Sequence, residues 1–330
     1  MENNVLIAGD AGEVRRKLAS LLARNEENRV YCVELLTRIR HHPVAMDCSD
    51  PANSRVSYLA YDDTEGIAGL IAELNPHTII NLSGVGGVAE PNDSSARQAP
   101  LATATRNLLE GARHAWLSRA TEGTTAGERC YLQVSTALPV DADMEVQSER
   151  SRSNDDSREL VQQPGAAVVG QCLARQWSQY HGLPTINVSV PNSFGPDQNR
   201  DQFFPRTIES LLQHKPLRFS QCRRDWAFVE DIVDAIAYIS EYGQPGEHYR
   251  VDCDKGEQTD IAIAEFICDQ LDQLTPRATG SYRDYVQAVL PTSISDNRQP
   301  EMRELGPSLG WQASNDFHCS LAATVRQYVP

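Results

Sequence analysis

The first part of the chain alternates short apolar runs with longer amphipathic segments. Short apolar runs are typical of buried strands, and apolar positions repeated every three or four residues are typical of helices. Because strands that are separated by helices pair in parallel, the pattern predicts an α/β fold with a doubly wound parallel sheet. We expect strands at Val5–Ala8, Arg29–Leu35, Ser57–Ala60, Thr78–Leu82 and Cys130–Ser135, with helices at Val14–Arg24, Glu65–Leu74 and Leu101–Trp116.

Residues 139–163 interrupt this pattern. The stretch is rich in Asp, Glu, Ser and Arg and has little apolar periodicity, so we expect a long, mobile acidic loop. After it, the pattern predicts a helix at Val168–Tyr180 and a strand at Thr185–Val190. The remainder mixes short strands with three expected helices, at Phe204–Gln213, Ile232–Glu241 and Ile261–Leu274.

The composition narrows the classes of partner. The chain has 330 residues, a formal net charge of −15 and a pI near 5.0. Such acidity argues against nucleic acid or an anionic membrane as the main binding partner, because a phosphate-binding surface needs clustered Lys and Arg. The eight cysteines include no Cys-x-x-Cys pair, so we expect reduced thiols and no metal site. These features favour a cytoplasmic protein that acts on a small-molecule substrate and spans no membrane.

A glycine-containing turn follows the first expected strand and precedes the first helix. A dinucleotide-binding turn needs glycines for a tight bend, for close approach to the pyrophosphate and for helix–strand packing. Gly9 and Gly12 fill the first two roles, but Arg15 stands at the third. Asp10 and Glu13 add negative charge where a pyrophosphate would sit. Arg15 either offsets this charge or occupies the site itself as an internal cation.

Two further carboxylates belong to the same expected site. Glu34 ends the second strand, where it is placed to accept a hydrogen bond from a ribose hydroxyl, and Asp62 follows the third strand. The alternative is a turn that preserves the fold and no longer holds a dinucleotide. We expect a Rossmann-like nucleotide-binding domain over residues 1–190 and a smaller substrate-binding lobe over 191–330, part of which crosses back to the first domain.

Several motifs along the chain resemble the extended short-chain dehydrogenase/reductases, the NAD-dependent epimerase/dehydratase family, and most specifically its dTDP-glucose 4,6-dehydratases. They include Val134-Ser135-Thr136, His181-Gly182-Leu183-Pro184, Asn192-Ser193-Phe194-Gly195-Pro196 and the specific run Arg224-Asp225-Trp226-Ala227-Phe228-Val229-Glu230-Asp231. The resemblance implies a homodimer and a reaction in which NAD oxidises a sugar hydroxyl, water is lost and the hydride returns. It also implies a Tyr-x-x-x-Lys pair, a Thr, and an Asp-Glu dyad after that Thr.

The catalytic pair that this resemblance implies is missing. Counting back from His181-Gly182 puts the tyrosine position at Gln163 and the lysine position at Ala167. Gln has no pKa suited to a general base, and Ala carries no charge. A test independent of alignment agrees, because the residues four before the three lysines are Glu, Leu and Val (Lys17, Lys215 and Lys255). No Tyr-x-x-x-Lys therefore exists in the sequence.

The acid–base dyad is missing as well. Ser135 and Thr136 match the family, but Ala137 and Leu138 follow them, and neither can transfer a proton. We therefore expect no conventional dehydratase activity, and either no required cofactor or a vestigial NAD(P). The candidate catalytic residues that are left are Thr136, Ser135 and Asn192, which follow the expected strand ends.

The expected substrate-binding residues are small or basic. Gly86 and Gly87 belong to a glycine-rich segment that would make the pocket roomier and less polar. The resemblance implies that Asn192 faces a substrate diphosphate and that Arg224 contacts its phosphate, with Arg298 as a second phosphate candidate. The alternative for Arg224 is a structural ion pair with Asp225.

Three functions stay open from the sequence. The first is an enzyme repurposed for a non-redox step: a cyclisation, isomerisation or elimination. The strong excess of Arg over Lys associates this function with natural-product biosynthesis. The second is a non-catalytic binding or partner subunit. The third is an atypical NAD-dependent nucleotide-sugar dehydratase or epimerase.

Overall fold

The computed structural model describes residues 3–9, 12–35, 54–61, 66–85, 94–117, 129–136, 166–200, 202–220, 223–253, 257–289 and 303–329. Eight strands form one sheet in the order β13-β10-β6-β5-β4-β1-β2-β3, and every neighbouring pair is parallel. The strands are β1 (Asn3–Ala8), β2 (Asn28–Leu35), β3 (Val56–Tyr61), β4 (Thr78–Gly84), β5 (Cys130–Ser135), β6 (Thr185–Ser189), β10 (His248–Arg250) and β13 (Arg303–Glu304). The predicted doubly wound parallel sheet is confirmed.

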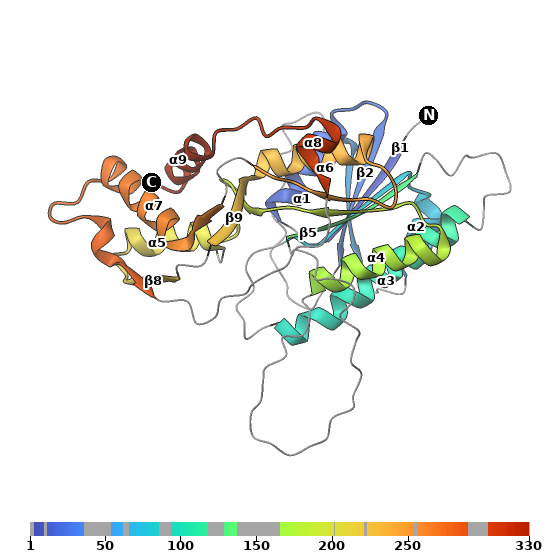
Figure 1. The fold of residues 1–330 in the computed structure, drawn as a ribbon, viewed down its shortest axis with the longest axis horizontal. Helices are drawn as coiled ribbons and strands as arrows, with labels where there is room; N and C mark the ends of the chain where they lie inside the picture. The colour runs from blue at the N-terminus through green and yellow to red at the C-terminus, as the bar shows by residue number, and fades with distance from the viewer. Residues whose placement is uncertain are drawn as a thin grey trace, which may run out of the picture.

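Helices cover both faces of this sheet (Figure 1). One face packs against α1 (Glu13–Ala23) and α6 (Val229–Tyr242), with α8 (Leu305–Leu309) beside them. The other face packs against α2 (Ile67–Leu74), α3 (Ser94–Leu117) and α4 (Ala166–His181). Each helix presents an apolar stripe to the alternate side chains of the strands, so the two cores lie on opposite sides of one sheet.

A smaller lobe lies beyond the carboxyl ends of the strands of the large sheet, to the left of that sheet in Figure 1. Its three-stranded sheet has the order β11-β9-β7, and a separate parallel pair joins β12 to β8. A third core, rich in aromatic residues, holds these strands against the lobe's helices. The elements are β7 (Asn192–Phe194), α5 (Phe203–Leu212), β8 (Leu217–Ser220), β9 (Arg223–Phe228), β11 (Glu257–Thr259), α7 (Asp260–Leu274), β12 (Val286–Val289) and α9 (Phe317–Tyr328).

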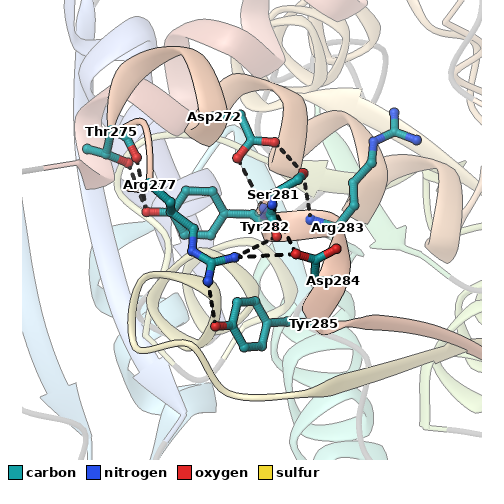
Figure 2. A network of polar contacts seen from close by, with 8 residues as sticks. All are labelled: Asp272, Thr275, Arg277, Ser281, Tyr282, Arg283, Asp284 and Tyr285. Carbon is teal, nitrogen blue, oxygen red and sulfur yellow. Dashed lines mark hydrogen bonds and ion pairs between the residues drawn. The ribbon is translucent and has the colours of Figure 1, made fainter. Parts of the chain in front are cut away.

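A polar network fixes the corner between α7 and β12 (Figure 2). The short 3-10 helix Tyr282–Tyr285 starts with a capping box, in which Ser281 caps the backbone and Asp284 reaches back to the N–H of Ser281. The Arg277 guanidinium donates to the Ser281 carbonyl oxygen at 2.7 Å and to the Tyr285 hydroxyl at 2.9 Å. β12 follows this 3-10 helix directly and pairs in parallel with β8, so the network belongs to the smaller lobe.

The motif Arg-Asp-Trp-x-x-Val-x-Asp has a structural role in the lobe. Trp226 is buried in the aromatic core. Asp231, 3% exposed, accepts hydrogen bonds from the backbone N–H groups of Ser314 and Asn315 and from the Asn315 side chain at 2.8 Å. Asp231 therefore ties α6 to the segment that leads into α9.

The predicted elements lie where the hydrophobic pattern placed them, with ends shifted by a few residues; α3 begins seven residues earlier than expected. The predicted acidic loop, 139–163, lies outside the described residues. Within the described part of the chain, no helix is both long and apolar enough to cross a membrane.

Candidate functional site

The carboxyl ends of four strands lie at one level and define the candidate site. Ser135 pairs in register with Gly84 of β4 on one side and with Ser189 of β6 on the other, and Ser189 pairs in turn with Arg250 of β10. The N–H of Val190 donates to the Ser135 carbonyl oxygen at 2.9 Å. This edge of an open parallel sheet is where ligands bind, and the smaller lobe begins directly beyond it.

The three predicted catalytic residues gather at this edge. Ser135 is fully buried, Thr136 follows it and is partly exposed, and Asn192 opens β7 two residues after the strand-end hydrogen bond. The Asn192 amide donates to the carbonyl oxygen of Asp225 at 3.1 Å, which joins β7 to β9. Thr136 and Asn192 are therefore partly exposed polar groups at the junction of the two sheets.

Arg224 lies on β9 with its side chain about one-third exposed. Its Nε is 3.0 Å from Oδ1 of the buried Asp260, and Arg250 is 3.6 Å from Asp225. In place of the expected alternative, an ion pair between Arg224 and Asp225, Arg224 pairs with the first residue of α7, and Asp225 pairs with Arg250 on β10 of the large sheet. Because Arg224 is held by a carboxylate and remains partly exposed, it can present its guanidinium to an anionic ligand.

The two glycines that border the turn after β1 meet the needs of a dinucleotide-binding turn. Gly9 has φ +136°, and a Cβ there would lie 2.9 Å from the carbonyl carbon of Leu82. Gly12 is the N-cap of α1, with no side chain capping the helix and no atom within 4 Å of an added Cβ. The N-terminus of α1 therefore carries N–H groups that no N-cap side chain satisfies, an arrangement that favours a phosphate.

The sequence predicted that Glu13 adds negative charge at this turn, but the carboxyl group points elsewhere. Its side chain is 6% exposed, and Oε1 accepts the N–H of Asp197 at 3.1 Å, so the carboxyl group faces the smaller lobe. Burial raises the pKa of Glu13 to about 7, offset in part by the bond from Asp197 and by Lys17. The raised pKa favours the protonated form near neutral pH relative to an exposed Glu, so repulsion of a bound anion is weakened.

A layer of buried polar side chains, which sequence reasoning missed, lies under the site on the α3 and α4 side. The Asn81 amide nitrogen is 3.1 Å from the Thr105 hydroxyl, 3.1 Å from the Tyr131 hydroxyl and 3.0 Å from Gln133 Oε1. Its oxygen accepts from the N–H and hydroxyl of Ser83. Polar residues at every second position of otherwise apolar strands were the available signal (Asn81 and Ser83; Gln133 and Ser135; Asn187 and Ser189).

The same layer continues across β6 to β10. The Ser189 hydroxyl is 2.9 Å from His248 Nε2 and accepts from the Gln171 amide at 3.2 Å, which anchors α4 to the sheet. Burial, together with the nearby Arg175, lowers the pKa of His248 to about 4. His248 is therefore neutral at physiological pH, and α4 rests on uncharged hydrogen-bonding groups.

The lowered pKa of His248 predicts a loss of stability in acid. The unfolded chain binds a proton at the ordinary pKa of 6.5, whereas the folded chain resists it down to about 4, so stability falls as pH falls through this window. We expect His248→Gln to remove a pH-dependent contribution on the order of 3 kcal/mol. Urea unfolding of both proteins at pH 7 and pH 4.5 measures it. An unchanged difference between them at the two pH values would contradict the burial of a neutral imidazole.

Other predicted site residues are placed only in part. Glu34 lies at the carboxyl end of β2 and Ala167 in the first turn of α4. The remaining predicted positions lie outside the described residues: Gln163, Asp62, Gly86, Gly87 and Arg298.

Comparison with known proteins decides the family. The model of the NAD dependent epimerase/dehydratase family matches residues 5–252, about three-quarters of the chain. The chain belongs to the NAD dependent epimerase/dehydratase family. The dTDP-glucose 4,6-dehydratase 1 of Escherichia coli strain K12 is 24% identical over 340 aligned residues, which cover 98% of this chain and 92% of that protein.

Two solved structures of the family share the fold over nearly the full length. The dTDP-glucose 4,6-dehydratase from Bacillus anthracis in complex with NAD has a TM-score of 0.68 at 19% identity, covering 99% of this chain and 96% of that one. The UDP-glucose 4-epimerase from Thermus thermophilus, also in complex with NAD, has a TM-score of 0.68 at 17% identity, with 98% of both chains covered.

These findings correct the expectation about the cofactor. The sequence suggested that no cofactor is required, or only a vestigial NAD(P). That expectation is wrong, because the family to which the chain belongs is NAD dependent and its solved relatives hold NAD.

Proposed function

We propose that this family member binds NAD and an anionic, nucleotide-sugar-like ligand but does not oxidise a sugar by the family's Tyr–Lys route, and that it catalyses a non-redox step: a cyclisation, isomerisation or elimination. One observation carries the proposal. No tyrosine stands four residues before a lysine anywhere in the 330 residues, and Ala137 and Leu138 replace the acid–base dyad.

The positions of the lysines support it. The Lys17 ammonium lies on α1, 3.3 Å from the carboxylate of Glu230, and Lys215 is exposed beyond the end of α5. Lys255 lies outside the described residues. Neither described lysine lies at the carboxyl edge of β4, β5 and β6, where a base that activates a sugar hydroxyl must act.

The turn after β1 fits the dinucleotide. Gly9 and Gly12 give the bend and the open helix N-terminus, and Glu34 lies where a ribose hydroxyl would meet the end of β2. Bound NAD supplies a hydride acceptor. The chain lacks the family's Tyr–Lys pair, which would remove the proton from the substrate hydroxyl, so the acceptor alone does not complete the oxidation by that route.

The chain's own residues support binding and orientation. Thr136 and Asn192 are partly exposed hydrogen-bonding groups at the strand ends, and Arg224 is a restrained cation on β9. Groups fixed on strands can hold a flexible substrate in one reactive conformation, which by itself accelerates a cyclisation or isomerisation. The proposal includes a role in natural-product biosynthesis and a homodimer. Each subunit has a nucleotide-binding domain up to about residue 190 and a smaller substrate-binding lobe after it.

The test is a product assay. The purified protein is incubated with NAD and dTDP-glucose, beside an authentic dTDP-glucose 4,6-dehydratase, and the 4-keto-6-deoxy product is measured by mass spectrometry. We expect a rate at least about 10⁴-fold below the authentic enzyme, because the base, its lysine and the dyad are all absent. Formation of the keto sugar at a comparable rate would refute the proposal.

A second arm distinguishes catalysis from binding alone. The 4-keto-6-deoxy sugar nucleotide is supplied in heavy water, and deuterium uptake at the carbons beside the ketone is followed with NAD absorbance. Uptake without NADH formation is the expected sign of non-redox proton transfer. A protein that shows neither product nor uptake would instead be a binding subunit.

A further inference from the structure

Arg15 is a buried cation at the dinucleotide turn, in the position where such turns carry their third glycine. The residue lies in the first turn of α1 and is 3% exposed. Its Nη1 donates to the carbonyl oxygen of Gly9 at 2.8 Å, so the guanidinium reaches back across the turn that joins β1 to α1. Its Nε is buried and has no hydrogen-bond partner among the described residues.

Among the residues whose side chains the structure describes, the groups around this guanidinium carry no compensating charge. Within the described part of the chain, its neighbours are the Gly9 carbonyl, the ring of Tyr58 at 5.8 Å and the Cys32 thiol. Burial raises the pKa of Cys32 to about 11 and also raises the pKa of Tyr58, so both groups are neutral near pH 7. The carboxyl group of Glu13 is directed away, toward Asp197.

A buried positive charge with an unsatisfied N–H favours the binding of an anionic ligand that supplies the missing counter-charge. The N-terminus of α1 adds a second, independent preference for the same kind of ligand, because it has no side-chain cap and Gly12 leaves it open. A guanidinium and helix N–H groups that converge on one turn match a phosphate.

We propose that Arg15 binds the pyrophosphate of the dinucleotide and supplies the positive charge that this turn uses in place of the usual close glycine packing. The inference rests on the proposed binding of NAD and adds a specificity-determining residue to it. The cofactor affinity of this protein then depends on a charge, and it falls as salt screens that charge.

The experiment measures dissociation constants for NAD, NADP and inorganic pyrophosphate by calorimetry. The variants are Arg15→Met, which removes the charge; Arg15→Gly, which restores the expected glycine; and Arg15→Lys, which keeps a charge. Arg16→Met is the matched control, because Arg16 lies on the same turn and donates to the Asp197 carbonyl oxygen at 3.0 Å. Circular dichroism and melting curves check that each variant folds.

We expect Arg15→Met and Arg15→Gly to weaken binding of NAD and of pyrophosphate by at least about tenfold, with Arg15→Lys intermediate and Arg16→Met within about twofold of wild type. Raising the salt concentration should weaken binding more in wild type than in Arg15→Met. If Arg15→Met does not fold, Arg15→Lys and the salt dependence of the wild type carry the test.

Two results would overturn the inference. Unchanged or tighter NAD binding by Arg15→Gly would make Arg15 an obstruction, and a loss confined to NADP would place it at a 2′-phosphate. Failure of the proposed function is separate: it shows as keto-sugar formation, or as a wild type that binds pyrophosphate through Arg15 yet binds no NAD.

Discussion

Replacing Glu13 by glutamine should change the free energy of unfolding in a pH-dependent way. The difference between Glu13→Gln and wild type should be about 2–3 kcal/mol more favourable to the variant at pH 8 than at pH 5. Glu13 is 6% exposed at the start of α1, and its Oε2 is buried with no hydrogen-bond partner among the described residues. Burial raises its pKa from 4.5 to about 7. At pH 8 the folded wild type must therefore hold a buried carboxylate that glutamine avoids.

The sign follows from proton binding. Between pH 4.5 and 7 the folded chain holds a proton on Glu13 that the unfolded chain has released, so stability falls as pH rises through this window. The charged groups that face Glu13 are Lys17 and Arg16 on its own helix and Asp197 on the adjoining loop, with the hydroxyl of Tyr328 on α9 near it. Burial, which raises the pKa, is the largest effect; the Asp197 N–H and the two cations lower the pKa, and the Asp197 carboxylate raises it.

The measurement is urea unfolding of wild type and Glu13→Gln at pH 5, 6, 7 and 8. Comparing the two proteins at each pH removes the opposite contribution of His248, which both share. A constant difference across the series would show that Glu13 titrates as an exposed carboxyl group does.

Replacing Gly195 by alanine should cost about 3 kcal/mol of stability, since the site has no room for a methyl group. Gly195 is buried between the two lobes, and an added Cβ would lie 2.6 Å from Val229 Cγ1 and 2.7 Å from Glu13 Oε2. The carbonyl oxygen of Gly195 also accepts from Tyr328, so the loop cannot retreat without losing that bond. Thermal melting and urea unfolding report the cost.

Gly69 provides the matched control. It is exposed on α2 and has no atom within 4 Å of an added Cβ, so Gly69→Ala should stabilise by about 0.5–1 kcal/mol through helix propensity alone. The double variant Glu13→Ala with Gly195→Ala should lose less than the sum of the single changes, because removing the carboxyl group makes room for the methyl group. Strict additivity would place the clash elsewhere.

The hydrophobic pattern predicted the large sheet well because its strands and helices are local features with clear periods. Cys130–Ser135 was predicted to the residue, and β1, β2 and α1 within one or two. The short strands of the smaller lobe, such as β7 and β11 with three residues each, were not predicted individually from the sequence. Three residues carry too little periodicity, and their pairing is set by partners distant in sequence.

The site was predicted in outline and not in its electrostatics. Sequence reasoning placed Thr136, Ser135 and Asn192 at one edge, because strand ends meet there in any parallel sheet. It could not show that Glu13 turns toward Asp197, that Arg224 pairs with Asp260, or that neutral His248 lies against Ser189. Each of these depends on long-range packing that a one-dimensional pattern does not contain.

The eight-stranded sheet is completed late in the chain, and this affects how the protein is made. β6 ends at Ser189, but its outer neighbour β10 begins at His248 and the final strand begins at Arg303. While the chain emerges from the ribosome, the edge of β6 stays unpaired during the synthesis of the whole intervening segment. A truncation before residue 248 would leave this hydrogen-bonding edge permanently exposed, so the N-terminal part of the chain should aggregate when it is expressed without the rest.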